Sequence, residues 1–282
     1  MFAKINHVAI ISDQYAMVSR FYEVLFNLKT SPKANQMSAI TVGDGYVGLN
    51  INPRKPGRAG GLDHFGVEVE DTETVFERMS RKYPEINWLK RPSNRPFAGI
   101  TTHDPDGNIF DLSQADMENR TDLYVEDAWE QERGITHYAV RTLHPEKCAE
   151  FYCDVLGLQM ANREEGDENF YVTDGRMTVV LMPWDITMYA GAGIARPGPD
   201  HIAFKVESLD GFKTDYKTMT ERNLTLTPPP VGVGPEGKAR LDLFDRSTPY
   251  AAHYLADLEN NMLAVSEQEP AQAGKKAARP AG

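Results

Sequence analysis

The chain repeats itself, and this repeat limits its possible folds more than any other feature. Residues 4 to 28, KINHVAIISDQYAMVSRFYEVLFNL, align with residues 134 to 158, GITHYAVRTLHPEKCAEFYCDVLGL, at an offset of 130. Two shorter matches follow in the same order: GLDHFGVEVED from Gly61 with GPDHIAFKVES from Gly198 at an offset of 137, and DPDGNIFDL from Asp104 with DLENNMLAV from Asp257 at an offset of 153. Because the offsets only grow, we interpret the chain as one duplicated domain with insertions in the second copy.

Each half is itself doubled. A strand with a histidine near its start opens each of four segments, and these histidines are His7, His64, His137 and His201. An amphipathic helix follows: Val18, Phe21, Tyr22 and Leu25 have the i, i+3, i+4, i+7 spacing of one buried face. Short strand-like runs such as SAITV and MTVVLM, separated by Gly-Asp or Asp-Gly turns, complete the segments. The predicted fold class is α+β, with four βαβββ modules.

The repeats also predict the domain boundaries. We expect domains at 1–114 and 134–268, each with two modules. Residues 115–133 carry seven acids against two arginines and are interpreted as a connector that is partly packed and helical near its end. Residues 269–282 contain no large apolar side chain, so they are expected to form a disordered tail.

Composition excludes several classes of partner. Thirty basic and 41 acidic residues give a net charge of −11, which argues against nucleic acid and against an anionic membrane surface. No apolar run approaches the roughly 18 residues of a membrane span, and the N-terminal MFAKINHVAI does not resemble a signal peptide. Cys148 and Cys153 fall on different sides of one predicted helix, where core packing explains them better than a disulfide. We therefore expect a cytoplasmic protein.

The modules resemble a known family. The first-strand histidines, the runs HVAI and FYEVLF, and the closing DPDGNIFDL are similar to the vicinal oxygen chelate superfamily, which includes glyoxalases, extradiol ring-cleaving dioxygenases and bleomycin-resistance proteins. The resemblance covers residues 3 to 268. It implies that modules pair into two cup-shaped mixed-sheet domains, in which side chains of the first and last strands converge on one divalent metal.

The resemblance implies ligands in the first half. His7 and His64 occupy the two first-strand positions and Asp111 occupies the last-strand carboxylate position, while the fourth position of glyoxalase-type members falls at Gly48, which has no side chain. Two imidazoles and one carboxylate leave about three positions open on an octahedral ion, as nonheme Fe(II) enzymes require for substrate and dioxygen. A metal also explains an aspartate between Phe110 and Leu112, which is otherwise costly to bury.

The second half differs at the same positions. His137 and His201 are present as second-cup candidates, but Ala264 stands at the carboxylate position and the other last-strand position falls near Val180. Two histidines hold a divalent ion poorly, so we expect that this half has lost its metal. Two-domain extradiol dioxygenases usually carry the metal in the C-terminal domain, so the two halves exchange roles here.

Two further residues are candidates for catalysis. His103 lies eight residues before Asp111 with the same strand parity, and it is interpreted either as the acid-base residue or as a solvent-exposed turn histidine. Tyr254, ten residues before Ala264, matches a substrate-binding tyrosine of the ring-cleaving enzymes or is an ordinary strand tyrosine. His144 and His253 are weaker candidates.

The predicted function is an extradiol-type dioxygenase that acts with O2 on a small catechol-like aromatic. Fe(II) is the preferred cofactor, with Mn(II) or another divalent metal as alternatives. Two other functions stay open: a glyoxalase-like lyase or epimerase, and a metal-free binding protein of the bleomycin-resistance type. The net charge favours a neutral or basic ligand unless local charge overrides it. The expected partners are a small molecule and, because paired modules often pair between chains, a second copy in a homodimer.

Overall fold

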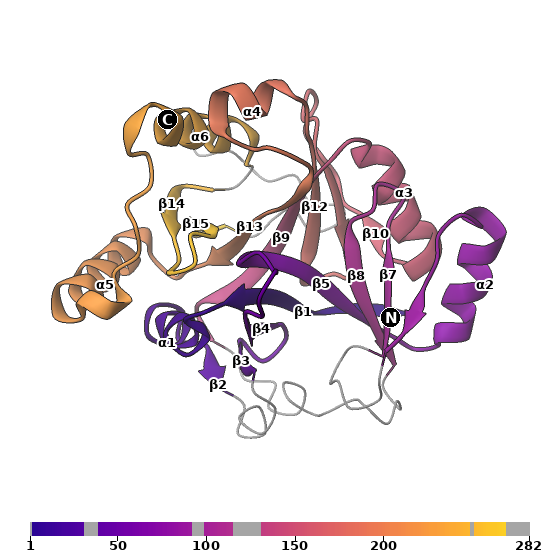
Figure 1. Ribbon diagram of the computed structural model, residues 1–282, viewed down its shortest axis with the longest axis horizontal. Helices are drawn as coiled ribbons and strands as arrows, with labels where there is room; N and C mark the ends of the chain where they lie inside the picture. The colour runs from indigo at the N-terminus through magenta and orange to yellow at the C-terminus, as the bar shows by residue number, and fades with distance from the viewer. Residues whose placement is uncertain (1, 31–38, 92–98, 115–130, 249–250, 269–282) are drawn as a thin grey trace.

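The computed structural model of the protein describes residues 2–30, 39–91, 99–114, 131–248 and 251–268. These residues form two mixed sheets with helices packed against them (Figure 1). The predicted α+β class and the duplicated arrangement are therefore confirmed. Most of the predicted connector and the whole predicted tail lie outside the described residues, so their helix and disorder stay predictions.

The first sheet comes from the first half of the chain. Its eight strands have the order β2-β3-β4-β1-β5-β8-β7-β6. Their bounds are β1 Ala3–Ser12, β2 Lys29–Thr30, β3 Ile40–Gly43, β4 Gly48–Pro53, β5 Gly61–Val69, β6 Leu89–Lys90, β7 Ile100–His103 and β8 Ile109–Gln114. Strands β1 and β5 open the two modules and lie antiparallel at the centre. Each also pairs in parallel with the last strand of its own module, β4 or β8. The central strands of the two modules therefore lie side by side.

The second sheet repeats this plan with one strand fewer. Its seven strands have the order β10-β11-β12-β9-β13-β15-β14. Their bounds are β9 Gly134–Thr142, β10 Gln159–Met160, β11 Phe170–Thr173, β12 Thr178–Pro183, β13 Gly198–Lys205, β14 His253–Ala256 and β15 Met262–Ser266. In the described part of the fourth module only two strands follow the first helix, so this module departs from the predicted βαβββ pattern.

Two extra helices account for the growing offsets between the repeats. Helix α4 (Thr187–Ala192) precedes β13, and α6 (Gly234–Ser247) lies between the 3-10 helix Leu224–Leu226 and β14. Figure 1 shows α4 and α6 together over one end of the second sheet. The insertions expected from the sequence are therefore these two helices of the second half, which have no counterpart in the described part of the first half.

The four repeated helices are α1 (Tyr15–Phe26), α2 (Thr72–Lys82), α3 (Pro145–Leu156) and α5 (Leu209–Arg222). They begin at equivalent residues, and α1 and α3 also end at equivalent residues, whereas α5 continues three residues further than α2. Asn27 and Gly157 end α1 and α3 in the left-handed conformation, with φ of 56° and 71°. Asp71 and Ser208 cap α2 and α5 through side-chain oxygens that accept backbone N–H groups. The duplication therefore extends to the capping residues.

The predicted buried helix faces are confirmed. Phe21 and Tyr22 of α1 are fully buried, and so are Phe151 and Tyr152 of α3. Both cysteines lie in α3 as free thiols, and Cys148 is fully buried, as core packing predicts.

The two halves share one core. Phe26 of α1 stacks on Phe204 of β13 with ring centroids 3.8 Å apart, and the ring of Phe65 in β5 lies 5.6 Å from that of Tyr138 in β9. Figure 1 shows α1 beside α5 and α2 beside α3, so helices of one half flank helices of the other. Burial of these large rings stabilises the two halves as one unit.

Paired aspartates join the halves through their backbones. Asp174 Oδ2 accepts the Ile5 N–H at 2.7 Å, and Asp44 Oδ2 accepts the Ile135 N–H at 2.8 Å. Asp174 follows Asp44 by 130 residues, as Ile135 follows Ile5. The other carboxylate oxygen of each aspartate closes its own Gly-Asp or Asp-Gly turn. These turns therefore fix the interface between the halves as well as their own hairpins.

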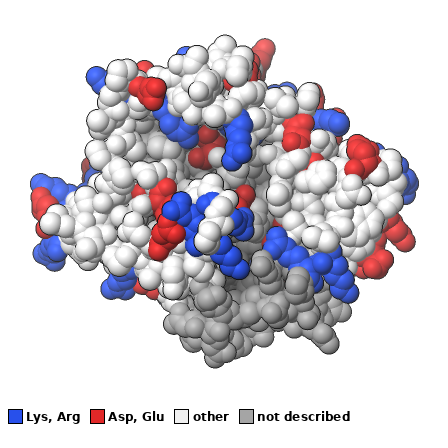
Figure 2. Space-filling model, in the orientation of Figure 1, with Lys and Arg blue, Asp and Glu red and all other residues white. Residues whose placement is uncertain are grey.

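No helix in the described part of the chain is both long and apolar enough to span a membrane. On the face shown in Figure 2, acidic and basic side chains are interspersed, and no continuous band of one sign crosses it.

Candidate metal centre

The three predicted ligands of the first half lie together on one face of the first sheet. The register pairs His7 of β1 with Gly66 of β5, and Gly66 with Asp111 of β8, so these positions form one row across three strands. His64 lies two residues from Gly66 and therefore shares its face. One ligand atom from each of His7, His64 and Asp111 lies within 4.8 Å of the others. Three strands thus place two imidazoles and a carboxylate around one point.

A glycine makes room for this arrangement. A Cβ on Gly66 would lie 1.9 Å from Cε1 of His7, so any larger residue there would displace the His7 imidazole. The second half has Ala203 at the corresponding position, paired with His137. The difference between Gly66 in HFGV and Ala203 in HIAF is visible in the sequence, but only the strand register shows that each residue lies beside a first-strand histidine.

Neighbouring residues hold the ligand side chains. Asn6 Oδ1 lies 2.8 Å from His7 Nδ1, and Asp63 Oδ2 lies 2.7 Å from His64 Nδ1. These contacts leave Nε2 of each ring for an ion, and His64 Nε2 lies 3.1 Å from Asp111 Oδ2. Thr101 of β7 donates a hydrogen bond to Asp111 Oδ1 at 2.5 Å. Each candidate ligand is therefore oriented by a residue that the sequence reasoning did not single out.

The three groups differ in their affinity for protons. Burial, together with the charge of His64, lowers the pKa of His7 to about 3. Burial also lowers the pKa of His64, but hydrogen bonds to Asp111 and Asp63 outweigh it and raise the pKa to about 9. Burial raises the pKa of Asp111, but the hydrogen bond to His64 and its charge outweigh burial and lower the pKa to about 2. Near neutral pH, His7 is therefore ready to ligate, whereas His64 must first lose a proton.

Arginines face both carboxylates of the centre. Arg91 Nη2 lies 3.5 Å from Asp111 Oδ1, and Arg91 Nε donates a hydrogen bond to Thr101 Oγ1. Arg58 forms an ion pair with Asp63 at 2.7 Å. The protein thus neutralises its own acids here, and the charge of a bound ion would need an anion from elsewhere. Arg91 carries no sequence signal of this role because it follows an exposed two-residue strand.

Access to the three groups is unequal. The side chains of His7 and Asp111 are almost fully buried, whereas that of His64 is 12% exposed. Gly48 of β4 pairs with His7 on its other side, so the fourth family position contributes no donor atom, as predicted. The described part of the centre therefore offers three protein ligands.

The two catalytic candidates lie in different places. His103 of β7 is on the Asp111 face of the first sheet, because Thr101 pairs with Asp111 and His103 with Ile109. The main-chain carbonyl of Asp104 lies 2.8 Å from His103 Nδ1. Tyr254 lies in β14 of the second sheet, paired with Ala264, and its hydroxyl donates to the Phe244 carbonyl at 3.3 Å. The structure therefore assigns Tyr254 to the other half and keeps His103 on the metal side.

The second half keeps the histidines in a different setting. His137 Nε2 and His201 Nε2 lie 3.0 Å apart, and Ala264 pairs with Ala203 as Asp111 pairs with Gly66. Phe244 of α6 packs on the His201 ring with centroids 5.3 Å apart. Among the described residues the metal-type cluster is the one in the first half, and the second half offers two histidines under a helix.

One position in the second half differs from the prediction. Thr178 pairs with His137 in the second sheet just as Gly48 pairs with His7 in the first, whereas the sequence comparison placed this position near Val180. The offset of 130 residues carries Gly48 to Thr178 and not to Val180. The correct counterpart is therefore a threonine, whose hydroxyl does not replace the missing carboxylate.

The sequence of this chain matches a known protein family. The model of the Glyoxalase/Bleomycin resistance protein/Dioxygenase superfamily matches residues 4–112 and 134–251. No curated protein sequence matches the chain.

Solved structures share the fold at low sequence identity. An Mn(II)-bound glyoxalase from Novosphingobium aromaticivorans matches with a TM-score of 0.63 and 13% identity, over 97% of this chain and 85% of that one. A 2,2',3-trihydroxybiphenyl 1,2-dioxygenase from Sphingomonas wittichii strain RW1 matches with a TM-score of 0.61 and 11% identity, over 96% and 92%. The 2,3-dioxygenase LapB from Pseudomonas sp. KL28 matches with a TM-score of 0.60 and 13% identity, over 96% and 94%.

Proposed function

Because the chain belongs to the glyoxalase/bleomycin resistance protein/dioxygenase superfamily, we propose that it is a metal-dependent dioxygenase of the extradiol ring-cleaving type. Its substrate would be a small catechol-like aromatic, and its metal would be held by His7, His64 and Asp111. One observation carries this proposal: the three ligand groups lie within 4.8 Å of one another, while Gly48 leaves the fourth position without a donor.

The residues fit a divalent transition metal. Two imidazoles and one carboxylate with further positions open are the donor set of nonheme Fe(II), and Mn(II) accepts the same ligands. The fit is supported by Gly66, which leaves space for the His7 ring, and by the contacts of Asn6 and Asp63 to the outer ring nitrogens. When bound, Fe(II) in such a site supplies a centre at which a vicinal diol and O2 can meet.

The residues around the centre determine which substrate it favours. Arg91 faces Asp111 and Arg58 faces Asp63, so the protein contributes little net negative charge here. A divalent ion would then attract a substrate that binds as an anion, such as an ionised catechol. Local charge therefore overrides the preference for neutral or basic ligands that the net charge of −11 suggests.

His103 is the proposed proton acceptor. A carbonyl oxygen only accepts hydrogen bonds, so the contact with Asp104 places the proton on His103 Nδ1 and leaves Nε2 as the basic nitrogen. This tautomer suits a general base that takes a proton from a substrate hydroxyl.

Metal content and oxygen uptake test the proposal. Protein purified anaerobically should contain about one iron per chain, and His7→Ala and Asp111→Ala should lose it. His137→Ala is the matched control, since it removes the equivalent histidine of the second half and should keep the metal. A loss of metal in His137→Ala but not in His7→Ala would show that the site lies in the second half and would contradict the proposed ligands.

The reaction is tested separately. Wild-type protein with iron should consume O2 in the presence of a catechol from a panel of substituted catechols. Bound metal without oxygen uptake would favour the glyoxalase-like lyase or epimerase, in which the metal polarises a carbonyl. A metal-free native protein that takes up no added metal would favour the binding protein and overturn both enzyme functions.

A further inference from the structure

The second half contains a cavity that the metal centre does not use. It has a volume of about 200 Å³ and lies between the loop 229–233, the start of α6 and the hairpin of β14 and β15. Its wall is mostly apolar, with Pro229, Val231, Leu241 and Met262, and its polar members include Arg240 and Asn260. The loop and helix that build it belong to the insertion that the first half lacks. The duplication therefore does not explain this cavity.

Arg240 is the charged residue in this wall. Its guanidinium lies 5.2 Å from the centroid of the Phe244 ring, and one nitrogen lies 3.8 Å from Asp200 Oδ1. Its side chain is only 30% exposed. Within the described residues these are its polar and ring contacts, and neither is a hydrogen bond at normal distance. An arginine this enclosed has N–H groups to offer to a ligand.

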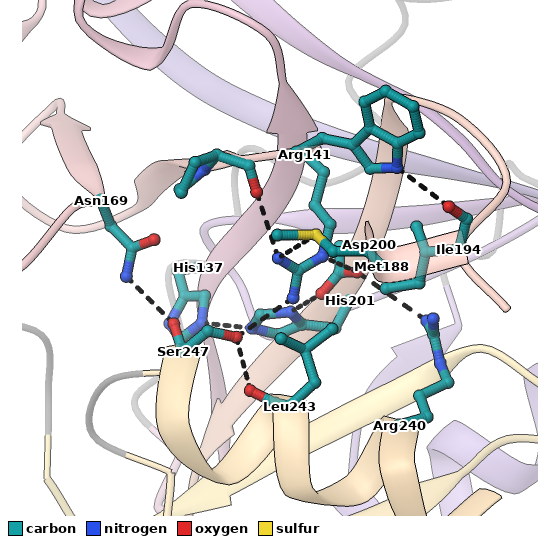
Figure 3. A network of polar contacts seen from close by, with 12 residues as sticks. His137, Arg141, Asn169, Met188, Ile194, Asp200, His201, Arg240, Leu243 and Ser247 are labelled. Carbon is teal, nitrogen blue, oxygen red and sulfur yellow. Dashed lines mark hydrogen bonds and ion pairs between the residues drawn. The ribbon is translucent and has the colours of Figure 1, made fainter. Parts of the chain in front are cut away.

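The nearby acid is already engaged. Asp200 Oδ1 accepts a hydrogen bond from Arg141 Nε at 2.9 Å, and Asp200 Oδ2 lies 2.9 Å from His201 Nδ1. Figure 3 shows Arg141 from β9 and Arg240 from α6 approaching Asp200 from two sides. Arg141 is 1% exposed and Asp200 is 2% exposed, so this pair is deeply buried. Two guanidinium groups therefore share one carboxylate, which leaves one positive charge in excess at the cavity.

The N-terminal end of α6 also contributes positive charge to the cavity. Gly232, Val233 and Gly237 line the cavity at the N-terminal end of this 14-residue helix. The N-terminal end of a helix carries partial positive charge. Val233 is the N-cap residue and supplies no side-chain acceptor. Glu236 in the first turn of α6 is exposed and does not line the cavity, so the charges that reach the cavity wall are positive, which disfavours a cation.

We propose that this cavity binds a small organic carboxylate with an apolar body, whose carboxylate pairs with Arg240. An apolar cavity of about 150 Å³ holds a benzene molecule in another protein, so 200 Å³ suits a six-membered ring or a short branched chain with one carboxylate. Nucleotides and most cofactors need the roughly 300 to 1,000 Å³ of common ligand sites. The site is independent of the proposed dioxygenase activity.

Calorimetric titration of the full chain tests this site. The titration uses the metal-free His7→Ala protein, because a carboxylate could otherwise bind a metal in the first half. Benzoate is the probe, benzamide is its uncharged counterpart, and inorganic phosphate is an anion without an apolar body. Benzoate should bind saturably with 1:1 stoichiometry, and benzamide and phosphate should bind about tenfold more weakly or worse.

Two variants locate the binding. Arg240→Gln should weaken benzoate about tenfold or more, whereas Arg246→Gln, an exposed arginine in the last turn of the same helix, should bind as the parent does. Val231→Phe fills the cavity from the opposite loop and should also remove binding, which keeps the test valid if Arg240→Gln does not fold. Absence of saturable benzoate binding, equal affinity for benzamide, or unchanged affinity in Arg240→Gln would each overturn the proposal.

Discussion

The hydroxyl of Tyr22 in α1 donates a hydrogen bond to Asp257 Oδ2 at 2.7 Å, across the interface between the two halves. The same bond is formed a second time in the other direction, from Tyr152 of α3 to Asp104 Oδ2 at 3.1 Å. Asp104 and Asp257 open the DPDGN and DLENN turns, and each also accepts backbone N–H groups of its own turn. These two turns therefore join the halves through a reciprocal pair of hydrogen bonds, one from each half to the other.

Tyr22→Phe should destabilise the protein by about 2 kcal/mol, because it leaves the buried Asp257 carboxyl without one of its donors. Urea unfolding followed by circular dichroism measures this change. Tyr189→Phe is the control, since that side chain is 59% exposed and its loss should change the free energy of unfolding by less than about 0.5 kcal/mol. Equal stability of Tyr22→Phe and wild type would show that the bond is dispensable.

Gly66→Ala should abolish metal binding and preserve the fold. The new Cβ would occupy the space of the His7 imidazole, but the second sheet already accepts Ala203 at the equivalent position. Metal content per chain and the far-ultraviolet circular dichroism spectrum measure the two effects. Ala203→Gly is the reciprocal control and should leave the metal content unchanged. Full metal content in Gly66→Ala would contradict the position that we assign to His7.

Metal binding should release about one proton per ion between pH 7 and 8. The pKa of His64 is raised to about 9 in the protein without an ion, so His64 is charged in this range and must lose its proton to ligate. His7, with a pKa of about 3, and Asp111, with a pKa of about 2, are already deprotonated. Affinity should therefore rise about tenfold per pH unit up to pH 9 and level off above it.

Calorimetric titration with Mn(II) in buffers of different ionisation enthalpy measures this proton release. The observed enthalpy should vary linearly with the ionisation enthalpy of the buffer, with a slope near one proton. A slope of zero would mean that His64 is neutral before the ion binds. Asp63→Asn provides a second check, because it removes one of the bonds that raise the pKa of His64 and should lower the proton release at pH 8.

Arg91→Gln should reduce the preference for anionic substrates. The variant removes the positive charge that faces Asp111, so KM for a carboxylated catechol should rise about tenfold while kcat changes less. KM for unsubstituted catechol should rise by a smaller factor. Steady-state oxygen uptake with both substrates measures the ratio. Arg20→Gln, which removes an exposed arginine of α1, is the control for net charge. An unchanged ratio in Arg91→Gln would exclude this role.

Local patterns in the sequence predicted the modules and most of their elements. The apolar spacing that includes Phe21 and Tyr22 predicted a helix with one buried face, and Gly-Asp turns marked the hairpins. The resemblance to the superfamily indicated one candidate site at His7, His64 and Asp111, and Ala264 indicated that the second half had lost it. Helices and hairpins depend on neighbours within a few residues, so the local sequence pattern predicts them directly.

The tertiary structure decided what surrounds those residues. Gly66 acquires its role only because strand register places it beneath the His7 ring, and Arg91 only because β6 pairs with β7 at the edge of the sheet. The growing offsets between the repeats predicted the insertions. They did not predict that α6 would cover His201 or bring Arg240 close to Asp200. Contacts of this kind join residues far apart in the chain. They follow from the packing of the sheets, which no local pattern encodes.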